Sequence, residues 1–536
     1  MPSSLLLLCA YFPVAFLIYL MVKKKSLPAS VALPLSAATV YLLCLFVFPF
    51  TSLQVHANVI LGGLLSLTPV LIIGSAIFLF KVLDSTGAME VIKSHLNNVS
   101  TNPVAQLVIV GWAFPFLIEG ASGFGTPAAL AAPILVGIGY APLRVAVLVL
   151  IMNSVPVSFG AVGTPTWFGF APLALSEDVQ LTVGKLSALI HLVCSFVIPF
   201  VALKCLLSWQ QIKANALYVL LCITVTMLPF VAVSFFSYEF PSLIGGLIGL
   251  VASIMFAKRG VGLEKTPTPS ANSASASNIP LMNLTKASFP IWGTILVLIV
   301  TRLPFLPFKS WLSSPHPVVS FSIENIGQFT IGHSGVISWE AILNTQTEWS
   351  LSLLYIPAIL PFWLVSFAML AICKSSISEV SQVVNNTVSQ MKKPLFALTG
   401  ALIFVTLMMM GEKSAPVYLI GDNLANTFGS AWLFFAPFLG ALGSFFSGSA
   451  TISNLTFGAI QTEVASRTDF PLTLVLALQS VGAALGNMVC INNIVAVASV
   501  LGLHNAEGQI LRKTVLPMLV YAVLAGVVAT LLWIVI

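Results

Sequence analysis

The sequence predicts an all-α polytopic membrane protein with about twelve transmembrane helices, plus two re-entrant hairpins with broken helices arranged as inverted repeats. Low charge, long apolar runs and a repeated pattern of interruptions lead to this fold class. Only 7% of the 536 residues are charged and 58% are hydrophobic, whereas about 25% of the residues of a soluble domain are charged. Several runs longer than about 18 residues carry no charge, enough for a helix to cross the bilayer.

The same composition excludes a soluble globular enzyme, a disordered chain and a disulfide-stabilised secreted domain. The net charge of +6 comes from short clusters at the ends of apolar runs. The positive-inside rule explains such clusters, so the expected surrounding is a lipid bilayer and no nucleic-acid partner is expected. The seven cysteines show no Cys-x-x-Cys or Cys/His spacing, so neither a disulfide framework, a metal site nor a cofactor is expected.

If basic clusters mark the cytoplasmic side, both termini lie outside and the path along the chain is self-consistent. The N-terminal spans are predicted at 1–57, and a first repeat follows at 58–203 with a hairpin at 103–140 and a broken helix at 142–176. Connecting spans at 204–303, with a cytoplasmic linker at 258–286, lead to an extracytoplasmic loop at 304–349. A second repeat at 350–503 has a hairpin at 430–466 and a broken helix at 470–503, and a C-terminal span at 504–536 ends the chain. The amphipathic stretches 83–99 and 374–393 are expected to be interfacial helices. Segment 304–349 is too short for an independent catalytic domain and is interpreted as a cap or spacer.

Each repeat contains two interruptions rich in Gly, Pro, Ser and Asn. They are Glu119–Pro127 and Asn153–Pro165 in the first repeat, and Ser447–Asn454 and Gln479–Asn487 in the second. A constant offset of 326 residues aligns Asn153 with Gln479 and Gly160 with Gly486. Non-helical backbone at membrane depth is tolerated only where protein or water satisfies it. Matched interruptions in two halves therefore indicate a transporter binding site, although close packing of small residues is the alternative explanation.

The charge pattern makes the two hairpins enter the membrane from opposite sides, which favours an inverted-repeat secondary transporter over a static pore. Hydroxyl and amide groups at the interruptions offer hydrogen bonds without the cost of a charge. The candidate substrate-binding residues are Ser122, Gly123, Gly125, Thr126, Asn153, Ser154, Ser447, Ser449, Thr451, Ser453, Asn454 and Asn487. Such a site suits a small organic monoanion with a hydroxyl group, and Arg144 is interpreted as an interfacial anchor.

Two ionisable residues are candidates for proton coupling. Glu119 lies between an apolar run of about sixteen residues and a glycine-rich interruption, which places it near mid-membrane. An ionised carboxylate there costs several kcal/mol unless it is paired, so this carboxyl group is expected to load and release a proton. His191, in the middle of a predicted span, is the second candidate. A structural Glu that caps the N–H groups of the hairpin is the alternative.

At these residues the chain resembles the lactate permease family, which carries L-lactate and glycolate with protons into bacteria. The resemblance is sharpest at Glu119–Pro127, Asn153–Gly163, Phe438–Gly440 with Gly448–Asn454, and Gly486–Leu503. It implies a multi-pass protein of the bacterial cytoplasmic (inner) membrane that performs symport of lactate or glycolate with a proton, and it leaves a homodimer open. This chain departs from the family where Ala450 replaces the usual acid and Asn487 the usual base. Their joint absence fits a pair of charges lost together.

Two other functions remain open from the residues. Thr451–Asn454 offers neutral oxygens that suit sodium as well as a carboxylate, so a sodium-coupled transporter of another organic anion is one alternative. The other is a rhomboid-like intramembrane serine protease, because Gly120–Gly123 has the pattern Gly-x-Ser-Gly and His191 could act as the base.

Overall fold

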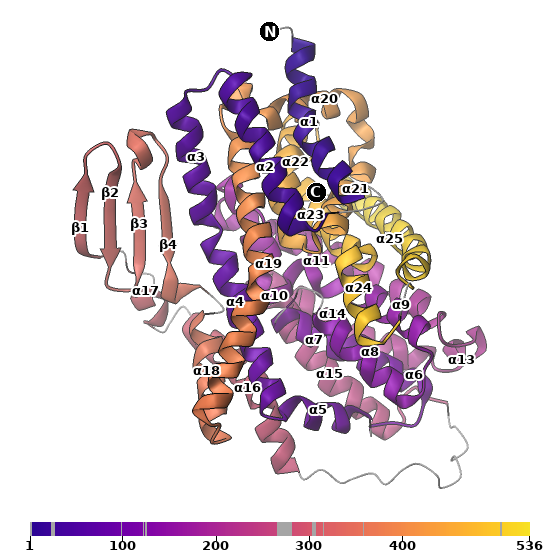
Figure 1. Ribbon diagram of the computed structural model, residues 1–536. Coiled ribbons are helices and arrows are strands. Elements are labelled where there is room, and N and C mark those ends of the chain that lie inside the picture. The colour runs from indigo at the N-terminus through magenta and orange to yellow at the C-terminus, as the bar shows by residue number, and fades with distance from the viewer. Residues whose placement is uncertain are drawn as a thin grey trace. The chain divides into compact units, whose positions relative to one another are not determined.

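The computed structural model describes residues 3–22, 27–97, 99–121, 123, 126–264, 281–302, 307–312, 314, 316–356, 359–503 and 506–535. The chain folds into two compact units, each assembled from two separate segments (Figure 1). Unit 1 contains Met1–Ala88 and Ser288–Thr427, and unit 2 contains Met89–Ala287 and Phe428–Ile536. The predicted first repeat, 58–203, is therefore divided between the two units at Ala88.

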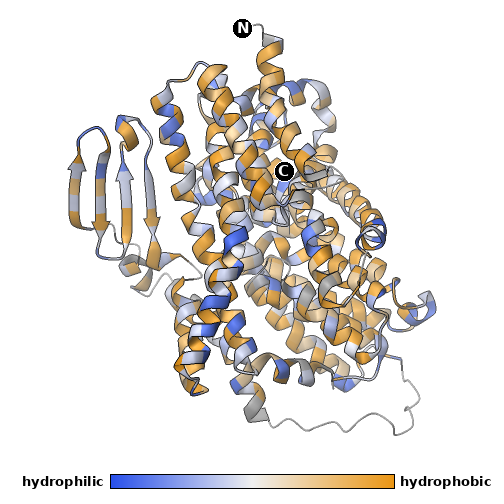
Figure 2. Cartoon of the chain, in the orientation of Figure 1, coloured by the Kyte–Doolittle hydropathy of each residue, from blue (hydrophilic) through white to orange (hydrophobic). Residues whose placement is uncertain are grey.

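The described residues confirm a mostly helical, polytopic membrane protein. Nine of their helical stretches are long and apolar enough to cross a membrane, or ten if the bent pair Pro142–Met152 and Val155–Leu173 forms one span. The predicted number of about twelve is not confirmed. Two further apolar helices are shorter in the searched residues, Ser4–Leu20 and Ile359–Ile372. Figure 2 shows hydrophobic residues along most of these helices.

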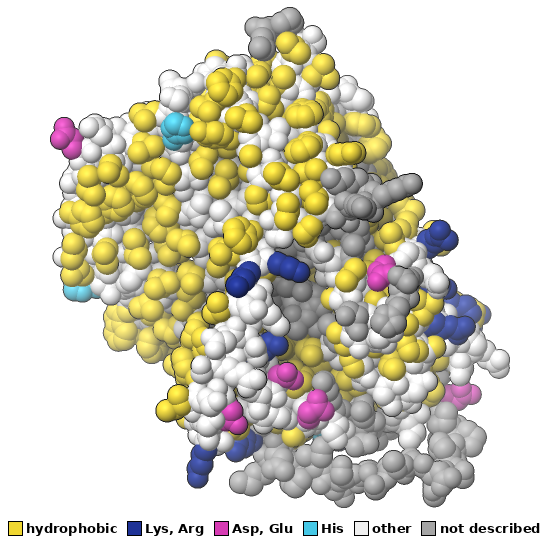
Figure 3. All heavy atoms as spheres, viewed as in Figure 1, with side chains coloured by type: hydrophobic (Ala, Val, Ile, Leu, Met, Phe, Trp, Pro, Cys, Tyr) yellow, Lys and Arg dark blue, Asp and Glu magenta, His cyan; other side chains and the backbone are white. Residues whose placement is uncertain are grey.

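Unit 1 contains nine helices and a small sheet within the described residues. The helices are α1 (Ser3–Val22), α2 (Ala29–Phe46), α3 (Ser52–Leu65), α4 (Leu67–Ser85), α16 (Leu281–Arg302), α17 (Phe308–Leu312), α18 (Ile359–Ile372), α19 (Ile377–Met409) and α20 (Pro416–Phe428). α19 packs against α2, α3 and α4, and Gly62 lets α3 approach α19 closely because a Cβ atom there would lie 2.6 Å from the Cα atom of Ile403. The outer side chains of α1 and α2 are apolar, Phe12 and Phe46 among them (Figure 3).

The predicted interfacial helix at 374–393 is wrong as a separate element. Its residues form the first half of α19, which continues through Pro394 into the apolar stretch that ends at Met409. Ser376 caps the start of this helix in a capping box with Glu379. The sequence suggested a boundary because its polarity changes at Lys392 and Lys393, yet the change in polarity does not interrupt the helix.

The segment predicted as a cap or spacer, together with the next three residues, forms a four-stranded antiparallel sheet in the order β1-β2-β3-β4 (Figure 1). Its strands are β1 (Pro317–Ile323), β2 (Gly327–Gly332), β3 (Val336–Glu340) and β4 (Trp349–Ser352). The register places Phe321, Phe329, Trp339 and Trp349 in one row across the strands. The rings of Phe321 and Phe329 stack at 5.3 Å, and those of Phe329 and Trp339 at 4.6 Å. No strand was predicted here, although the alternation of apolar and polar residues in Val-Ser-Phe-Ser-Ile is typical of one.

Unit 2 contains the two regions predicted as hairpins and the two predicted as broken helices. Its helices are α5 (Ala88–Asn97), α6 (Pro103–Val108), α7 (Phe114–Ala121), α8 (Thr126–Ile138), α9 (Pro142–Met152), α10 (Gly160–Trp167), α11 (Glu177–Ser195), α12 (Ile198–Leu203), α13 (Trp209–Ala214), α14 (Ala216–Ser234), α15 (Pro241–Arg259), α21 (Trp432–Ser447), α22 (Ala450–Arg467), α23 (Leu472–Gly486), α24 (Ile491–Val500) and α25 (Glu507–Val535). A π-helical stretch, Ile109–Ala113, joins α6 to α7. α5 falls within the stretch predicted as an amphipathic helix.

Candidate functional site

Two helical hairpins form one side each of the candidate site. Hairpin 1 consists of α6, α7 and α8, and hairpin 2 of α21 and α22, and in both the helices before and after the turn pack together. The turns use glycines in left-handed backbone conformations, with φ of 62° at Gly123 and 75° at Gly448. Ser449 then caps α22 by accepting a hydrogen bond from the N–H of Ile452 at 3.3 Å.

Each of two further helices is interrupted next to a hairpin. Break 1 (residues 153–165) follows α9, and break 2 (residues 487–490) follows α23. The first break bends its helix pair by 45°. Asn153 and Asn487 each occupy the residue directly after the helix. These two residues are therefore structural equivalents, whereas the predicted partner of Asn153, Gln479, lies in the interior of α23.

Break 1 contains a left-handed turn of three residues. Ala161, Val162 and Gly163 have φ values of 45°, 57° and 70°, a conformation that costs residues with a Cβ atom roughly 1–2 kcal/mol each. Gly163 also has no room for a side chain, because a Cβ atom would lie 2.7 Å from the Cα atom of Glu239. The surrounding structure must hold this turn in place.

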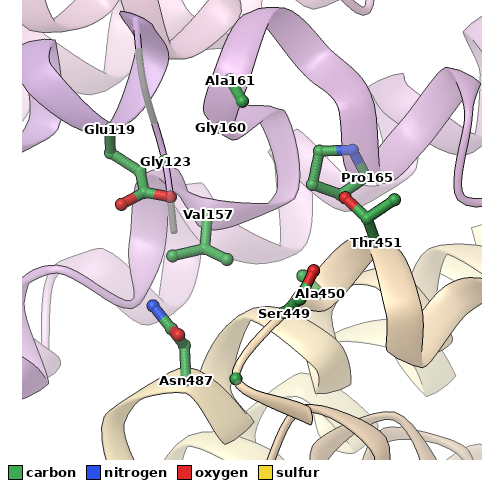
Figure 4. Close-up of a pocket in the computed structure, with 11 residues that line it drawn as sticks. Glu119, Gly123, Val157, Gly160, Ala161, Pro165, Ser449, Ala450, Thr451 and Asn487 are labelled. Carbon is green, nitrogen blue, oxygen red and sulfur yellow. The ribbon is translucent and has the colours of Figure 1, made fainter. Parts of the chain in front are cut away.

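The tips of the two hairpins and the two breaks surround a narrow cavity of about 20 Å³ (Figure 4). It is lined by Glu119, Gly123, Val157, Gly160, Ala161, Pro165, Gly448, Ser449, Ala450, Thr451 and Asn487. Five of the residues predicted from the sequence thus meet here: Glu119, Gly123, Ser449, Thr451 and Asn487. The lining residues Val157, Gly160, Ala161 and Pro165 were not predicted individually, although they belong to the interruption that the sequence marked.

Glu119 is the one ionisable residue among the described residues that line the cavity. Its side chain is 2% exposed, and Asn153 Nδ2 donates a hydrogen bond to Glu119 Oε2 at 2.9 Å. The other carboxylate oxygen, Oε1, faces the glycine backbone, since a Cβ atom at Gly160 would lie 2.5 Å from it and one at Gly123 3.3 Å. The absence of side chains at these two positions makes room for the carboxyl group.

Neutral hydrogen-bonding groups lie on the hairpin 2 side of the cavity. Asn493 donates to Asn487 Oδ1, which directs the amide NH₂ of Asn487 into the cavity, as Figure 4 shows. Ala450 and Thr451 form the first turn of α22. The free N–H groups of a helix N-terminus and its partial positive charge suit a carboxylate.

Five predicted residues of the breaks and of hairpin 2 do not line the cavity. One is Asn153, whose amide instead donates to the lining residue Glu119. The hydroxyl of Ser154 donates to Ile151 O, that of Ser447 to Gly443 O and that of Ser453 to Gly440 O. Asn454 donates to Pro165 O at 2.9 Å. Ser122 and Gly125 lie outside the described residues, as does the side chain of Thr126.

His191 is fully buried but does not line the cavity. Its Nε2 atom lies 2.8 Å from Ser158 Oγ and its Nδ1 atom 2.5 Å from the hydroxyl of Tyr521. Ser158 directly follows the lining residue Val157 and also donates to Ser480 O at 3.1 Å. Among the described residues, no group of three or more His, Cys, Asp and Glu side chains could hold a metal ion.

The family model and the relatives that match this chain all indicate the same protein family. The family model for L-lactate permease matches residues 6–536. A Haemophilus influenzae protein assigned by name to the L-lactate permeases is 46% identical over 97% of each chain. The L-lactate permease of Escherichia coli K12 is 27% identical over 98% of this chain and 95% of its own, and the glycolate permease of the same strain is 26% identical over 91% and 89%.

These similarities extend over the whole site and confirm the resemblance that the motifs suggested. The relatives are permeases, so the chain is a multi-pass membrane transporter and not an enzyme, and the protease alternative is rejected. The chain belongs to the L-lactate permease family.

Proposed function

We propose that this protein carries L-lactate, or the smaller glycolate, across the bacterial cytoplasmic membrane together with a proton. The observation that carries the proposal is the cavity of unit 2, where two hairpin tips and two breaks surround a single buried carboxyl group, Glu119. The names of the relatives support the substrate class. Matched broken helices are the usual site of substrate in transporters built from repeats.

The chemistry of the substrate anion matches the groups on the neutral side of the cavity. Its carboxylate would accept hydrogen bonds from the Asn487 amide, the Thr451 hydroxyl and the first N–H groups of α22. Val157 and Ala450 offer an apolar contact for the methyl group of lactate. No Lys or Arg lies among the described lining residues, and a dianion would usually require one. A small 2-hydroxy monocarboxylate is therefore the best match.

Glu119 is proposed to carry the proton. A buried carboxylate is costly in the membrane unless it is protonated or hydrogen-bonded, and Asn153 supplies one hydrogen bond to the ionised form. The carboxyl group shares its cavity with the proposed substrate anion, whose negative charge favours a protonated Glu119. Binding of the anion and of the proton thereby support each other, which is the requirement for symport.

His191 is proposed as a second group on the proton path, connected to the site through Ser158 rather than placed in it. The resemblance to the family implies an acid and a base where this chain has Ala450 and Asn487, both in the cavity wall. Glu119 is thus left as the titrating group of this cavity.

The variant Glu119→Gln tests the proposal because it keeps the size of the side chain and cannot titrate. We expect it to exchange labelled lactate across the membrane and to lose accumulation driven by an inward proton gradient. Glu177→Gln, at an exposed position in the first turn of α11, is the matched control and should accumulate lactate normally. Accumulation by Glu119→Gln at the parental level would show that the proton travels elsewhere.

A further inference from the structure

A chain of buried amide side chains crosses unit 2 behind the cavity. Trp432 Nε1 donates to Gln461 Oε1 at 2.8 Å, and Gln461 Nε2 donates to Gln479 Oε1 at 2.9 Å. Gln479 Nε2 donates to Asn454 Oδ1 at 3.3 Å, and Asn454 Nδ2 donates to Pro165 O at 2.9 Å. Every member is at most 2% exposed. The chain therefore runs from the start of hairpin 2 to the lining residue of break 1.

The groups at its two ends determine how each side-chain amide in this series of hydrogen bonds is oriented. The indole N–H of Trp432 can only donate, so it must meet an oxygen of Gln461. The NH₂ group of Gln461 then faces the carbonyl of Ala436, which can only accept, at 3.0 Å. Each following amide must take the same orientation to avoid placing two oxygens or two NH₂ groups together. Asn454 is consequently held with its NH₂ group toward the carbonyl oxygen of Pro165.

The contact that Asn454 makes is close-packed as well as hydrogen-bonded. A Cβ atom at Gly169 would lie 2.8 Å from Asn454 Cβ, and one at Gly458 would lie 3.1 Å from the ring of Phe170. α22 thus packs directly on the segment that follows break 1. Asn454 is one helical turn after Ala450 and Thr451, which line the cavity. Its link to Pro165 therefore joins the wall of the cavity that break 1 forms to the wall that hairpin 2 forms.

We propose that Asn454, held by Gln479 and Gln461, is a positioning residue that sets the width of the cavity and thereby the size of the acid that is carried. The inference rests on the proposed function, because it assumes that this cavity holds the substrate. Asn454 acts on the substrate only through Pro165 and α22. Its own amide groups are occupied by Gln479 and Pro165.

The expected consequence is a preference by size. Where the methyl group of lactate meets apolar side chains, here Val157 and Ala450, one additional methylene group that does not fit costs about tenfold or more. The parent protein should therefore take up L-lactate at least about tenfold more efficiently than 2-hydroxybutyrate, which is one methylene longer. Loss of the Asn454–Pro165 link should widen the cavity and bring this ratio close to one.

The test compares initial uptake of labelled L-lactate and 2-hydroxybutyrate by the full chain in vesicles, normalised to the amount of transporter. Asn454→Leu removes the donor to Pro165 at similar side-chain size. We expect the lactate KM to rise and the preference for lactate over 2-hydroxybutyrate to fall by about tenfold, with a smaller change in the maximal rate. Thr462→Val, on the same helix, removes a hydroxyl that bonds only within α22 to Gly458 O and should leave the preference unchanged.

An unchanged preference in Asn454→Leu, at the parental amount in the membrane, would overturn the inference. If that variant does not reach the membrane, the same preference is measured in Gln479→Leu. This variant keeps Asn454 but removes the hydrogen bond that Gln479 donates to it, so the preference should fall here too. Failure of the proposed function has a different signature, since the parent protein would then transport neither acid.

Discussion

The carboxyl group of Glu119 and the amide of Asn153 form a pair suited to both protonation states. Asn153 Nδ2 donates to the ionised carboxylate, and Asn153 Oδ1 is buried without a hydrogen-bond partner among the described residues. If Glu119 binds a proton, its O–H can donate to that oxygen after the amide rotates. The amide can therefore hydrogen-bond to the carboxyl group both before and after proton release. A fixed positive charge could accept no hydrogen bond from the protonated form.

The glycine at position 160 provides a steric test of this arrangement. Its backbone, with φ of −65° and ψ of 159°, is accessible to alanine, so Gly160→Ala introduces no backbone strain. The added Cβ atom would lie 2.5 Å from Glu119 Oε1 and would displace the carboxyl group. We expect lactate uptake to fall about 100-fold, the scale of a 1 Å misplacement at a site.

Gly63→Ala in α3 is the matched control, because a Cβ atom there meets nothing within 4 Å. This variant should transport normally and gain slightly in stability, since alanine is favoured over glycine in a helix by about 1 kcal/mol. Normal uptake by Gly160→Ala would mean that the Glu119 carboxyl group need not stay where the structure places it.

The sequence drew attention to Glu119 because an acidic residue between an apolar run and a glycine-rich interruption is unusual. The structure places this residue in the cavity wall, and its role in proton coupling stays a prediction. The hydroxyl residues were harder to assign. Ser154 and Ser453 carry the same groups as Thr451, but their hydroxyls donate to nearby carbonyls of the helices. Sequence shows which groups are present at an interruption and does not show which of them the backbone turns toward the cavity.

At the scale of elements, break 1 is held by side chains that donate to its free carbonyl groups. Ser242 donates to Pro156 O at 2.6 Å, Thr166 to Ser158 O at 2.8 Å and Trp167 to Val162 O at 3.1 Å. Unpaired carbonyls at membrane depth are costly, so these donors replace the hydrogen bonds that a continuous helix would have supplied. They also fix the left-handed turn that lines the cavity.

A substitution at Thr166 tests whether these hydrogen bonds stabilise break 1, because Thr166 does not line the cavity. Thr166→Val keeps the shape of the side chain and removes the donor to Ser158 O, leaving a buried carbonyl unpaired at a cost of about 1–3 kcal/mol. We expect a lower midpoint of thermal unfolding for the purified protein in detergent. Thr182→Val is the control, because the Thr182 hydroxyl donates to Asp178 O at an exposed site. Equal midpoints in the two variants would contradict this account of the break.

The elements differ in how far the sequence could predict them. The hairpins follow from apolar runs that meet Gly448 and Gly123, where a turn needs a left-handed residue. The equivalence of the two breaks was misjudged: the 326-residue offset aligned Asn153 with Gln479. α9 has 11 residues before its break and α23 has 15. Matching by residue type cannot detect such an insertion, whereas the helix ends in the structure show it directly.

At the scale of the molecule, each unit combines an early and a late segment of the chain. The whole candidate site belongs to unit 2, whose hairpin 1 comes from the first of these segments and hairpin 2 from the second. Neither segment alone can form the cavity, because Glu119 comes from the first segment and Thr451 from the second. Unit 1 supplies no described residue to this site, and its long helices and sheet form a separate packed body.

The sidedness of unit 1 is the remaining prediction. Positive charge places 374–393 inside, and the acidic segment 304–349, with its sheet, outside. The helix that connects them, α18, has 14 residues and spans only about 21 Å of the roughly 30 Å hydrocarbon layer. The membrane must therefore be thinned locally, or the apolar residues before α18 must complete the crossing.

Single cysteines on either side of α18 test this crossing. Ser320→Cys in β1 and Ser378→Cys in α19 are both at exposed positions. They are introduced into a background in which the partly exposed Cys9, Cys205 and Cys373 are replaced by serine. In right-side-out vesicles, an impermeant maleimide should label Ser320→Cys and should label Ser378→Cys only after permeabilisation. Labelling of both before permeabilisation would place α18 along one surface of the membrane and would reverse the assignment of every segment that follows it.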